Sequence, residues 1–192
     1  MIQKFEFKET EIPGLIEVTP FNADDIRGCF TKDYSKEVFE ANGITHNLAE
    51  VFYTTSYKGV IRALHFQREK QQAKLVRCIH GHVFDVVVDL RPESLSFKKW
   101  LGFDLTGENK KELLIPGGCA HGYLVLEESI VSYKCGEKFY GEFDDGIMWN
   151  DTEIGIDWPL DKIGGADKLI VADKDMNLQS FSEFMSKHGG LK

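Results

Sequence analysis

Two apolar runs of the sequence carry an unusual number of ionisable side chains. The runs, residues 59–67 and 73–89, are dense in Val, Ile, Leu and Phe, and they contain Arg62, His65, Lys74, Arg77, Asp85 and Asp89. Runs of this composition are typical of strands in a protein core, where a charged group is costly unless it is paired or used. An imidazole beside cations and carboxylates is suited to proton transfer next to a stabilised anion. We therefore predict that the two strands form the wall of a polar pocket inside a β-barrel.

His65 is the candidate base of this pocket. Arg62 and Lys74 are basic neighbours that favour the neutral imidazole, which is the form that a general base needs. The alternative is a core histidine whose ring bonds a backbone carbonyl. Strict strand alternation places Arg62 and His65 on opposite faces. If both side chains point into one pocket, a β-bulge must lie between them, as is common beside active sites.

Three more residues could take part in such chemistry. Lys74 could hold a positive charge beside a developing enolate, or it could keep an edge strand soluble. Asp85 lies within the apolar string VFDVVV, so we predict that it is buried and paired with Lys74 or Arg77. Tyr133 lies on a predicted strand and could supply a phenolic proton, or it could be a core residue.

His121 ends the string IPGGCAH, which reproduces the Pro-x-Gly-x-x-His pattern of the second cupin motif. In metal-binding cupins that histidine joins two further histidines and a glutamate from the first motif. The only His-x-His string here is His80-Gly81-His82, which we predict to lie in a hairpin turn that points both rings outward. No glutamate follows at the expected spacing. Because a metal needs convergent ligands, we predict no metal site.

The composition limits the class of protein. The chain has 192 residues, 42% of them hydrophobic, with a net charge of −8 and a pI near 5.3. That charge argues against general binding to nucleic acid or to an anionic membrane. No stretch has the character of a signal peptide or a membrane span. The cysteines, which are Cys29, Cys78, Cys119 and Cys135, form no C-x-x-C pair. We therefore predict buried free thiols, no zinc ribbon and a cytoplasmic protein.

Short β-rich segments separated by turns dominate the chain. Besides the two central runs, the predicted strands are two within 2–20 and one each at 50–56, 100–105, 110–116, 123–126 and 129–134. The predicted turns lie at 80–82, 117–122 and 127–128, with a loop at 24–30. Helices are predicted at 31–43 and within 176–192, with a tail that frays from about 180. The aromatic-rich segment 139–160 should cover the barrel. The pattern predicts one all-β domain, residues 1–192, folded as a sandwich or barrel.

Several strings of the chain, taken in order, resemble the signatures of one family. GVIRALHFQ, AKLVRCIHGHVFDVVVDLR, IPGGCAHGYLVLEE, SYK, GIMWND, GIDWP and VADKD are similar to those of the dTDP-4-dehydrorhamnose 3,5-epimerase family, from about Thr19 to Asp175. The resemblance implies a cupin-like jelly-roll barrel with a few short helices, a homodimer, and an isomerase without metal or cofactor. Its substrate would be a nucleoside-diphosphate 4-keto-6-deoxyhexose. C3 and C5 would be inverted by deprotonation beside the C4 ketone and reprotonation on the opposite face.

By position, the resemblance implies a role for each matching residue. His65 would be the base, Asp175 would orient it, Lys74 would stabilise the enolate and Tyr133 would be the acid on the opposite face. Arg62 and His121 would line the pocket near the diphosphate and the sugar, with Asp85 beside Lys74. The other substrate-binding residues that it implies are Arg27, Phe30, Lys32, Glu50, Gln67, Tyr140 and Lys174, with Phe139 and Tyr140 at the place of the family's aromatic pair.

Departures from the family concentrate at positions that read the thymine. Lys32 stands where the family has an acid, and Glu50 and Phe52 where it has amides. Hydrogen-bond readout tolerates such changes poorly, so we hypothesise a base other than thymine, either guanine or cytosine. The alternatives to a double epimerase are a mono-epimerase acting only on C3 or C5 of a GDP-, CDP- or dTDP-linked 4-keto sugar, a metal-dependent cupin enzyme, and a non-catalytic sugar-nucleotide binding cupin.

Overall fold

The computed structural model describes residues 4–192, so the part of the first strand prediction on residues 2 and 3 lies outside it. Within the described residues the chain forms twelve β-strands, three α-helices and two short 3-10 helices. The strands are β1 (Glu6–Glu9), β2 (Ile16–Thr19), β3 (Phe21–Asp25), β4 (Gly28–Lys32), β5 (Glu50–Ser56), β6 (Val60–Gln67), β7 (Lys74–Asp89), β8 (Trp100–Thr106), β9 (Glu112–Ile115), β10 (Cys119–Cys135), β11 (Asp144–Gly146) and β12 (Ile170–Val171). The helices are α1 (Lys36–Ala41), α2 (Asp173–Met176), α3 (Phe181–His188), η1 (Leu160–Ile163) and η2 (Ala166–Lys168).

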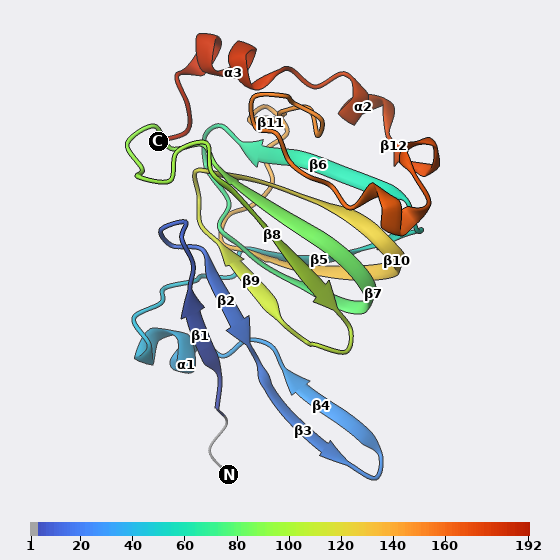
Figure 1. The fold of residues 1–192 in the computed structure, drawn as a ribbon. Helices are drawn as coiled ribbons and strands as arrows, with labels where there is room; N and C mark the ends of the chain where they lie inside the picture. The colour runs from blue at the N-terminus through green and yellow to red at the C-terminus, as the bar shows by residue number, and fades with distance from the viewer. Residues whose placement is uncertain (1–3) are drawn as a thin grey trace.

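Two long strands, β7 and β10, belong to both layers of the barrel (Figure 1). Residues 83–89 of β7 pair with residues 119–125 of β10, and β8 and β6 flank this half to make the first layer. Residues 74–78 pair with residues 131–135, and β9 and β5 flank them to make the second layer. Strands β2 and β1 extend the second layer beyond β9, while β11 and β12 add to β6. The two facing layers confirm the predicted jelly-roll barrel.

The predicted hairpin turns at 80–82 and 127–128 are wrong. Both β7 and β10 run through these positions without ending, and the pairing between them shifts register there. Each strand bends at this place from one layer into the other. Gly81 has a φ of +79°, and a Cβ added to it would lie 2.0 Å from the carbonyl oxygen of Glu128. Because only glycine fits such a position, the turn signal in the sequence marked a bend inside a strand.

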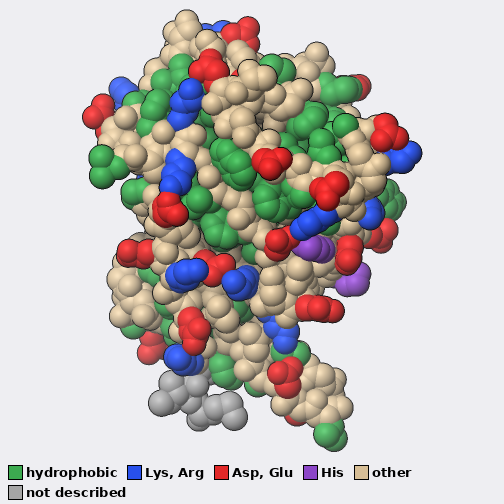
Figure 2. All heavy atoms as spheres, in the orientation of Figure 1, with side chains coloured by type: hydrophobic (Ala, Val, Ile, Leu, Met, Phe, Trp, Pro, Cys, Tyr) green, Lys and Arg blue, Asp and Glu red, His purple; other side chains and the backbone are tan. Residues whose placement is uncertain are grey.

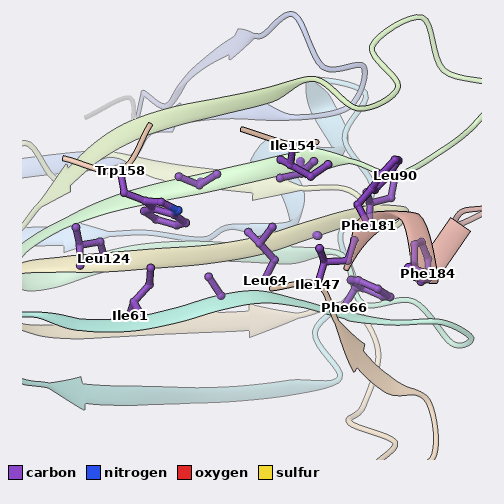
Figure 3. Packing of buried hydrophobic residues seen from close by; sticks show 14 of the residues in the cluster. Ile61, Leu64, Phe66, Leu90, Leu124, Ile147, Ile154, Trp158, Phe181 and Phe184 are labelled. Carbon is purple, nitrogen blue, oxygen red and sulfur yellow. The ribbon is translucent and has the colours of Figure 1, made fainter. Parts of the chain in front are cut away.

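Apolar side chains fill the space between the layers and also cover the outer side of the first layer. Between the layers, β7 and β10 contribute residues such as Val76, Val87 and Val131. On the outer side, Ile61, Leu64 and Phe66 of β6 pack with Leu124, Ile147, Ile154, Trp158, Phe181 and Phe184 (Figure 3). Burial of a side chain of this size contributes about 1.5–3 kcal/mol. The prediction that the aromatic segment after residue 139 packs as a cover is confirmed.

The N-terminal third differs from its prediction. The expected loop at 24–30 is most of a β-hairpin, in which β3 and β4 pair with each other and with no other described strand. This hairpin projects from the barrel, at the lower right of Figures 1 and 2. The helix expected at 31–43 is shortened to α1 because residues 28–32 continue as β4. Phe39 of α1 packs with Phe5 and Phe7 against the second layer.

The C-terminal end is more ordered than predicted. Ser180 and Glu183 form a capping box at the start of α3, and Gly189 ends the helix in the left-handed conformation. Leu191 is 2% exposed and its N–H donates to the carbonyl of Leu90, so the predicted fraying is wrong.

Three of the four cysteines follow their prediction. Cys78, Cys119 and Cys135 are buried as predicted, whereas Cys29 is exposed on the hairpin. Among the helices of residues 4–192, none combines the length and the apolar character needed to cross a membrane.

Candidate active site

A cavity of about 520 Å³ lies between the layers, with walls from β5, β6, β7 and β10 and a rim from the segment around α2. Eight of the predicted site residues line it, and they are Arg62, His65, Gln67, Lys74, His121, Tyr133, Lys174 and Asp175. The structure therefore gathers in one place side chains that the chain carries on four different elements.

A β-bulge in β6 brings Arg62 and His65 to the same face. His121 pairs with His65 and Tyr123 with Arg62, so three residue steps along β6 match two along β10. The extra residue lets both side chains enter the cavity, while Ile61 and Leu64 point into the outer core. The bulge that the sequence required is confirmed. Arg62 Nε donates to the hydroxyl of Ser56 over 3.1 Å, which fixes the guanidinium against β5.

His65 and Asp175 form a hydrogen-bonded pair at the cavity wall. The distance between His65 Nε2 and Asp175 Oδ2 is 3.1 Å. Strand β12 pairs in parallel with residues 60–61 of β6, and the chain then turns through α2, which carries Asp175 over His65. Asp175 is buried and His65 is partly open to the cavity. A carboxylate that accepts one imidazole N–H leaves the other ring nitrogen free as a base and stabilises the imidazolium that forms.

Asp85 lies behind His121, away from solvent. Its two oxygens are 3.0 and 2.9 Å from His121 Nε2. Burial raises the pKa of Asp85, against the opposing influence of His121 and then Lys74. Burial also lowers the pKa of Lys74, and the nearby Cys135, Asp144 and then Asp85 counteract this. The prediction that Asp85 is buried is confirmed, but its hydrogen bonds go to His121, and Arg77 pairs with Asp33 instead.

Tyr133 enters the cavity from the second layer, whereas His65 enters it from the first layer. It is 8% exposed, and its ring stacks on Phe52 with centroids 4.8 Å apart and planes 14° apart. Burial, followed by the neighbouring Tyr123, raises the pKa of Tyr133 well above that of a free phenol. Such a phenol stays protonated at neutral pH and can serve as a proton donor.

The loop after β10, which carries Phe139 and Tyr140, is held at the cavity mouth by Gln67 and Glu50. The amide of Gln67 donates to the carbonyls of Lys70 and Lys138 and accepts from the Tyr140 N–H. Glu50 accepts from the Phe139 N–H over 3.0 Å. Phe139 lines the cavity, whereas Glu50 and Tyr140 do not. In this chain these polar groups position an aromatic rim.

Lys174 lies in α2 and also lines the cavity. Its ammonium contacts the carboxylate of Asp144, which follows the loop and begins β11. The lysine is largely exposed, so it remains accessible to an anionic ligand at the mouth.

Three predicted substrate-binding residues do not reach this cavity. Arg27, Phe30 and Lys32 lie on the projecting hairpin, and none of them lines the cavity of its own chain. The reason is that β3 and β4 pair only with each other among the described strands, so the hairpin extends away from the barrel.

Sequence reasoning missed several cavity residues. Thr54 was not predicted, and Phe52 was noted only as a departure in base recognition; both line the cavity. Strict alternation along 50–56 puts residues 52, 54 and 56 on one face, and this signal could have found them. Tyr123 does not line the cavity, but its hydroxyl contacts that of Thr54, and no local pattern of the sequence signals this contact.

The described residues contain no group of three or more His, Cys, Asp or Glu side chains placed to hold a metal ion. His82 is bonded to Asp104 at the surface and His80 is exposed.

A jelly-roll barrel that holds a His–Asp pair and a buried tyrosine in one cavity defines a cupin-type protein equipped for acid–base chemistry. The family model described as dTDP-4-dehydrorhamnose 3,5-epimerase matches residues 9–183. The chain is 44% identical over 181 residues to a dTDP-4-dehydrorhamnose 3,5-epimerase of Methanothermobacter thermautotrophicus, covering 94% of this chain and 96% of that one. This chain therefore belongs to the dTDP-4-dehydrorhamnose 3,5-epimerase family.

Solved structures agree with this assignment. A dTDP-4-dehydrorhamnose 3,5-epimerase from Bacillus anthracis with TDP and PPi bound superposes with a TM-score of 0.86 at 38% identity, covering 93% of this chain and 100% of that one. A dTDP-6-deoxy-D-glucose-3,5-epimerase from Legionella pneumophila, in complex with dTDP-4-keto-L-rhamnose, gives a TM-score of 0.89 at 33% identity, with 96% of each chain covered.

Proposed function

We propose that this chain is an isomerase that inverts C3 and C5 of a nucleoside-diphosphate 4-keto-6-deoxyhexose, converting dTDP-4-dehydro-6-deoxyglucose to dTDP-4-dehydrorhamnose. Family membership supports this reaction. The observation that carries it is the bonded His65–Asp175 pair in the same cavity as Tyr133. The two sets of groups belong to different layers of the barrel, as a base and an acid on opposite faces of a sugar require.

The proton transfers follow from the chemistry of the ketone. The C4 carbonyl acidifies the hydrogens on C3 and C5, and the free nitrogen of His65 removes one of them. Electrons move toward the ketone oxygen to give an enolate, and the proton on His65 gives an imidazolium that Asp175 stabilises. Tyr133 then donates its proton to the same carbon from the other face, which inverts the centre. The cycle repeats at the second carbon.

Lys74 is the cation that we place beside the enolate oxygen. A positive charge preorganised in a poorly hydrated cavity stabilises developing negative charge far better than it would in water. Asp85 bonds His121, so it holds that imidazole at the cavity wall, and its charge also favours the protonated form of Lys74. Arg62 and His121 are proposed to bind the sugar and the diphosphate.

The nucleotide is proposed to lie at the cavity mouth, against Phe139 and near Lys174. We favour dTDP, because relatives of this family carry dTDP or TDP ligands. The hypothesis of a different base rested on Lys32, Glu50 and Phe52. In this chain Glu50 bonds the loop backbone and Phe52 stacks on Tyr133, which weakens that hypothesis. Competition binding with dTDP, GDP and CDP tests it, and a preference for GDP or CDP would restore it.

We further propose a cytoplasmic homodimer in which the hairpin of one chain approaches the cavity of the other. The exposed apolar side chains of Ile26 and Phe30 on the hairpin support an interface. The four cysteines are free, which favours a reducing compartment.

The first experiment is proton exchange in D2O. The chain is incubated with dTDP-4-dehydro-6-deoxyglucose, and deuterium at C3 and C5 is read by NMR and mass spectrometry. We expect deuterium at both carbons with the wild type and none with His65→Asn. Uptake at one carbon would identify a mono-epimerase, and the absence of uptake with the wild type would contradict the proposed function.

A further inference from the structure

The ring of the proposed acid is stacked on a second aromatic ring of the cavity wall. Phe52 and Tyr133 lie directly opposite each other on the antiparallel strands β5 and β10. Their ring planes are 14° apart and their centroids 4.8 Å apart. Both side chains line the cavity. The acid therefore enters the cavity with its ring held against the ring of Phe52.

A contact of this kind fixes the point from which a phenol donates its proton. Two side-chain torsions place the hydroxyl of a tyrosine, and offset stacking keeps the two ring planes parallel. The ring of His121, which is bonded to Asp85, meets the ring of Tyr133 at 72°, with centroids 6.0 Å apart. A change in either torsion of Tyr133 would break its stacking on Phe52.

Core packing does not account for Phe52. Its residue is 43% exposed, and β5 pairs only with β10 among the described strands. Tyr133 belongs to the apolar cluster between the layers, whereas the apolar clusters formed by the described residues do not include Phe52. The contact that Phe52 makes on the cavity wall is thus a contact with the acid rather than with the core.

We propose that Phe52 is a positioning residue for proton delivery by Tyr133, and this inference rests on the proposed epimerase reaction. Asp175 orients the base by a hydrogen bond, and Phe52 orients the acid by stacking. Proton transfer is fast only from a donor that is held at the reacting atom. When the phenol is held in place, Tyr133 protonates the enolate carbon before His65 returns its proton to the original face.

Loss of the stacking should therefore separate deprotonation from inversion. His65 still removes the hydrogen from carbon, and the N–H of the imidazolium exchanges with D2O because His65 is partly open to the cavity. With Tyr133 displaced, the imidazolium returns deuterium to the same carbon from the same face, and the enolate reverts to the ketone. The hydrogen leaves as HOD, and the starting sugar nucleotide is labelled without being inverted.

Phe52→Ala provides the main test, in D2O with dTDP-4-dehydro-6-deoxyglucose. Initial rates of deuterium uptake are measured by NMR and mass spectrometry in the recovered substrate and in the inverted products. We expect the total rate of uptake to stay within about twofold of wild type, while the ratio of labelled substrate to inverted product rises by ~10-fold or more. Tyr133→Phe, which lacks the proposed acid, gives the upper limit of that ratio.

Three further variants separate the role of the ring from that of its bulk. Phe52→Tyr keeps the aromatic plane and should keep the wild-type ratio. Phe52→Leu keeps apolar bulk without the plane and should raise the ratio. Tyr53→Ala is the matched control, because Tyr53 is exposed, alternates to the other face of β5 and does not line the cavity. Its ratio should equal that of wild type, and thermal unfolding checks the fold of each variant.

The outcomes separate this inference from the proposed function. A wild-type ratio in Phe52→Ala or in Phe52→Leu would overturn the inference and leave the epimerase intact. Equal slowing of uptake and inversion in Phe52→Ala would also overturn it, since that result indicates a distorted cavity rather than a displaced acid. A wild-type chain that inverts neither carbon would refute the proposed function, and the inference with it.

Discussion

At the scale of single residues, the cavity assigns different surroundings to its base and its acid. His65 is partly open and bonded to a buried carboxylate, which suits a group that gains and loses a proton in every cycle. Tyr133 is enclosed, and its pKa is raised, which suits a group that must arrive protonated. A base that is open to the cavity and an acid that is kept protonated match the two roles of an acid–base pair.

Replacing Asp175 tests the orienting role directly. Asp175→Asn keeps the shape but removes the negative charge that stabilises the imidazolium, so we expect kcat to fall by ~100-fold or more with little change in KM. Steady-state kinetics on the 4-keto substrate measure this. Asp173→Asn, an exposed carboxylate on the same helix α2, is the matched control. Equal activity of the two variants would contradict the role.

At the scale of elements, the composition and periodicity of the sequence predicted where strands lie better than where they end. The segments 59–67, 73–89 and 50–56 were identified as strands because alternation and β-branched residues reflect local burial. The continuity of β7 through Gly81 was missed, because a glycine with positive φ indicates a turn and a strand bend equally well. The bulge in β6 was foreseen only through the need to bring Arg62 and His65 together.

A charged cluster on the second layer fastens the segment between β4 and α1 to the barrel. Lys134 Nζ lies 2.8 Å and Arg77 3.5 Å from the carboxylate of Asp33. Glu112 of β9 pairs in register with Arg77 and is fully buried. Among the described residues, neither carboxylate oxygen of Glu112 has a hydrogen-bond partner. Burial raises the pKa of Glu112 well above its ordinary value, against the attraction of Lys134 and Arg77.

This burial predicts a pH-dependent stability. Above pH 4.5, the ordinary pKa of a glutamate, the unfolded chain loses the Glu112 proton while the folded chain retains it. The free energy of unfolding should therefore decrease as pH rises toward the folded pKa, by up to about 1.4 kcal/mol per pH unit for this one proton. Glu112→Gln cannot titrate, so its urea-unfolding free energy should fall less steeply over the same range.

Glu108→Gln is the control for that measurement, because Glu108 is an exposed carboxylate in the turn before β9. It should keep the wild-type slope. Parallel pH profiles for wild type and Glu112→Gln would show that Glu112 is ionised in the folded chain.

At the scale of the whole molecule, the hairpin of β3 and β4 lines no part of the cavity of its own chain. Its tip carries Arg27 and its second strand carries Phe30 and Lys32, which the family resemblance assigns to substrate binding. In a homodimer, such residues can serve the cavity of the other chain without any change of fold.

Mixed dimers test this arrangement. His65→Asn chains keep a normal hairpin, and Arg27→Ala/Phe30→Ala chains keep a normal His65. Each should be nearly inactive alone, and an equal mixture should regain about a quarter of wild-type activity, because random pairing gives half heterodimers with one complete site each. Chains that carry all three changes are the control and should rescue neither variant. Mixtures that form dimers by light scattering but stay inactive would contradict the proposal.

The sequence alone determined which residues have the chemistry and which segments are strands. Arg62, His65, Lys74 and Asp85 were visible as ionisable groups in apolar runs, because burial is encoded locally by neighbouring side chains. The family resemblance added Tyr133 and Asp175. Only the tertiary structure decided that Asp85 bonds His121 and that Tyr123 contacts Thr54. It also decided that Gln67 and Glu50 hold the loop at the cavity mouth, and that the hairpin extends away from the cavity of its own chain. These contacts join residues far apart in the chain, and their geometry depends on where long strands bend and pair, which no local pattern specifies.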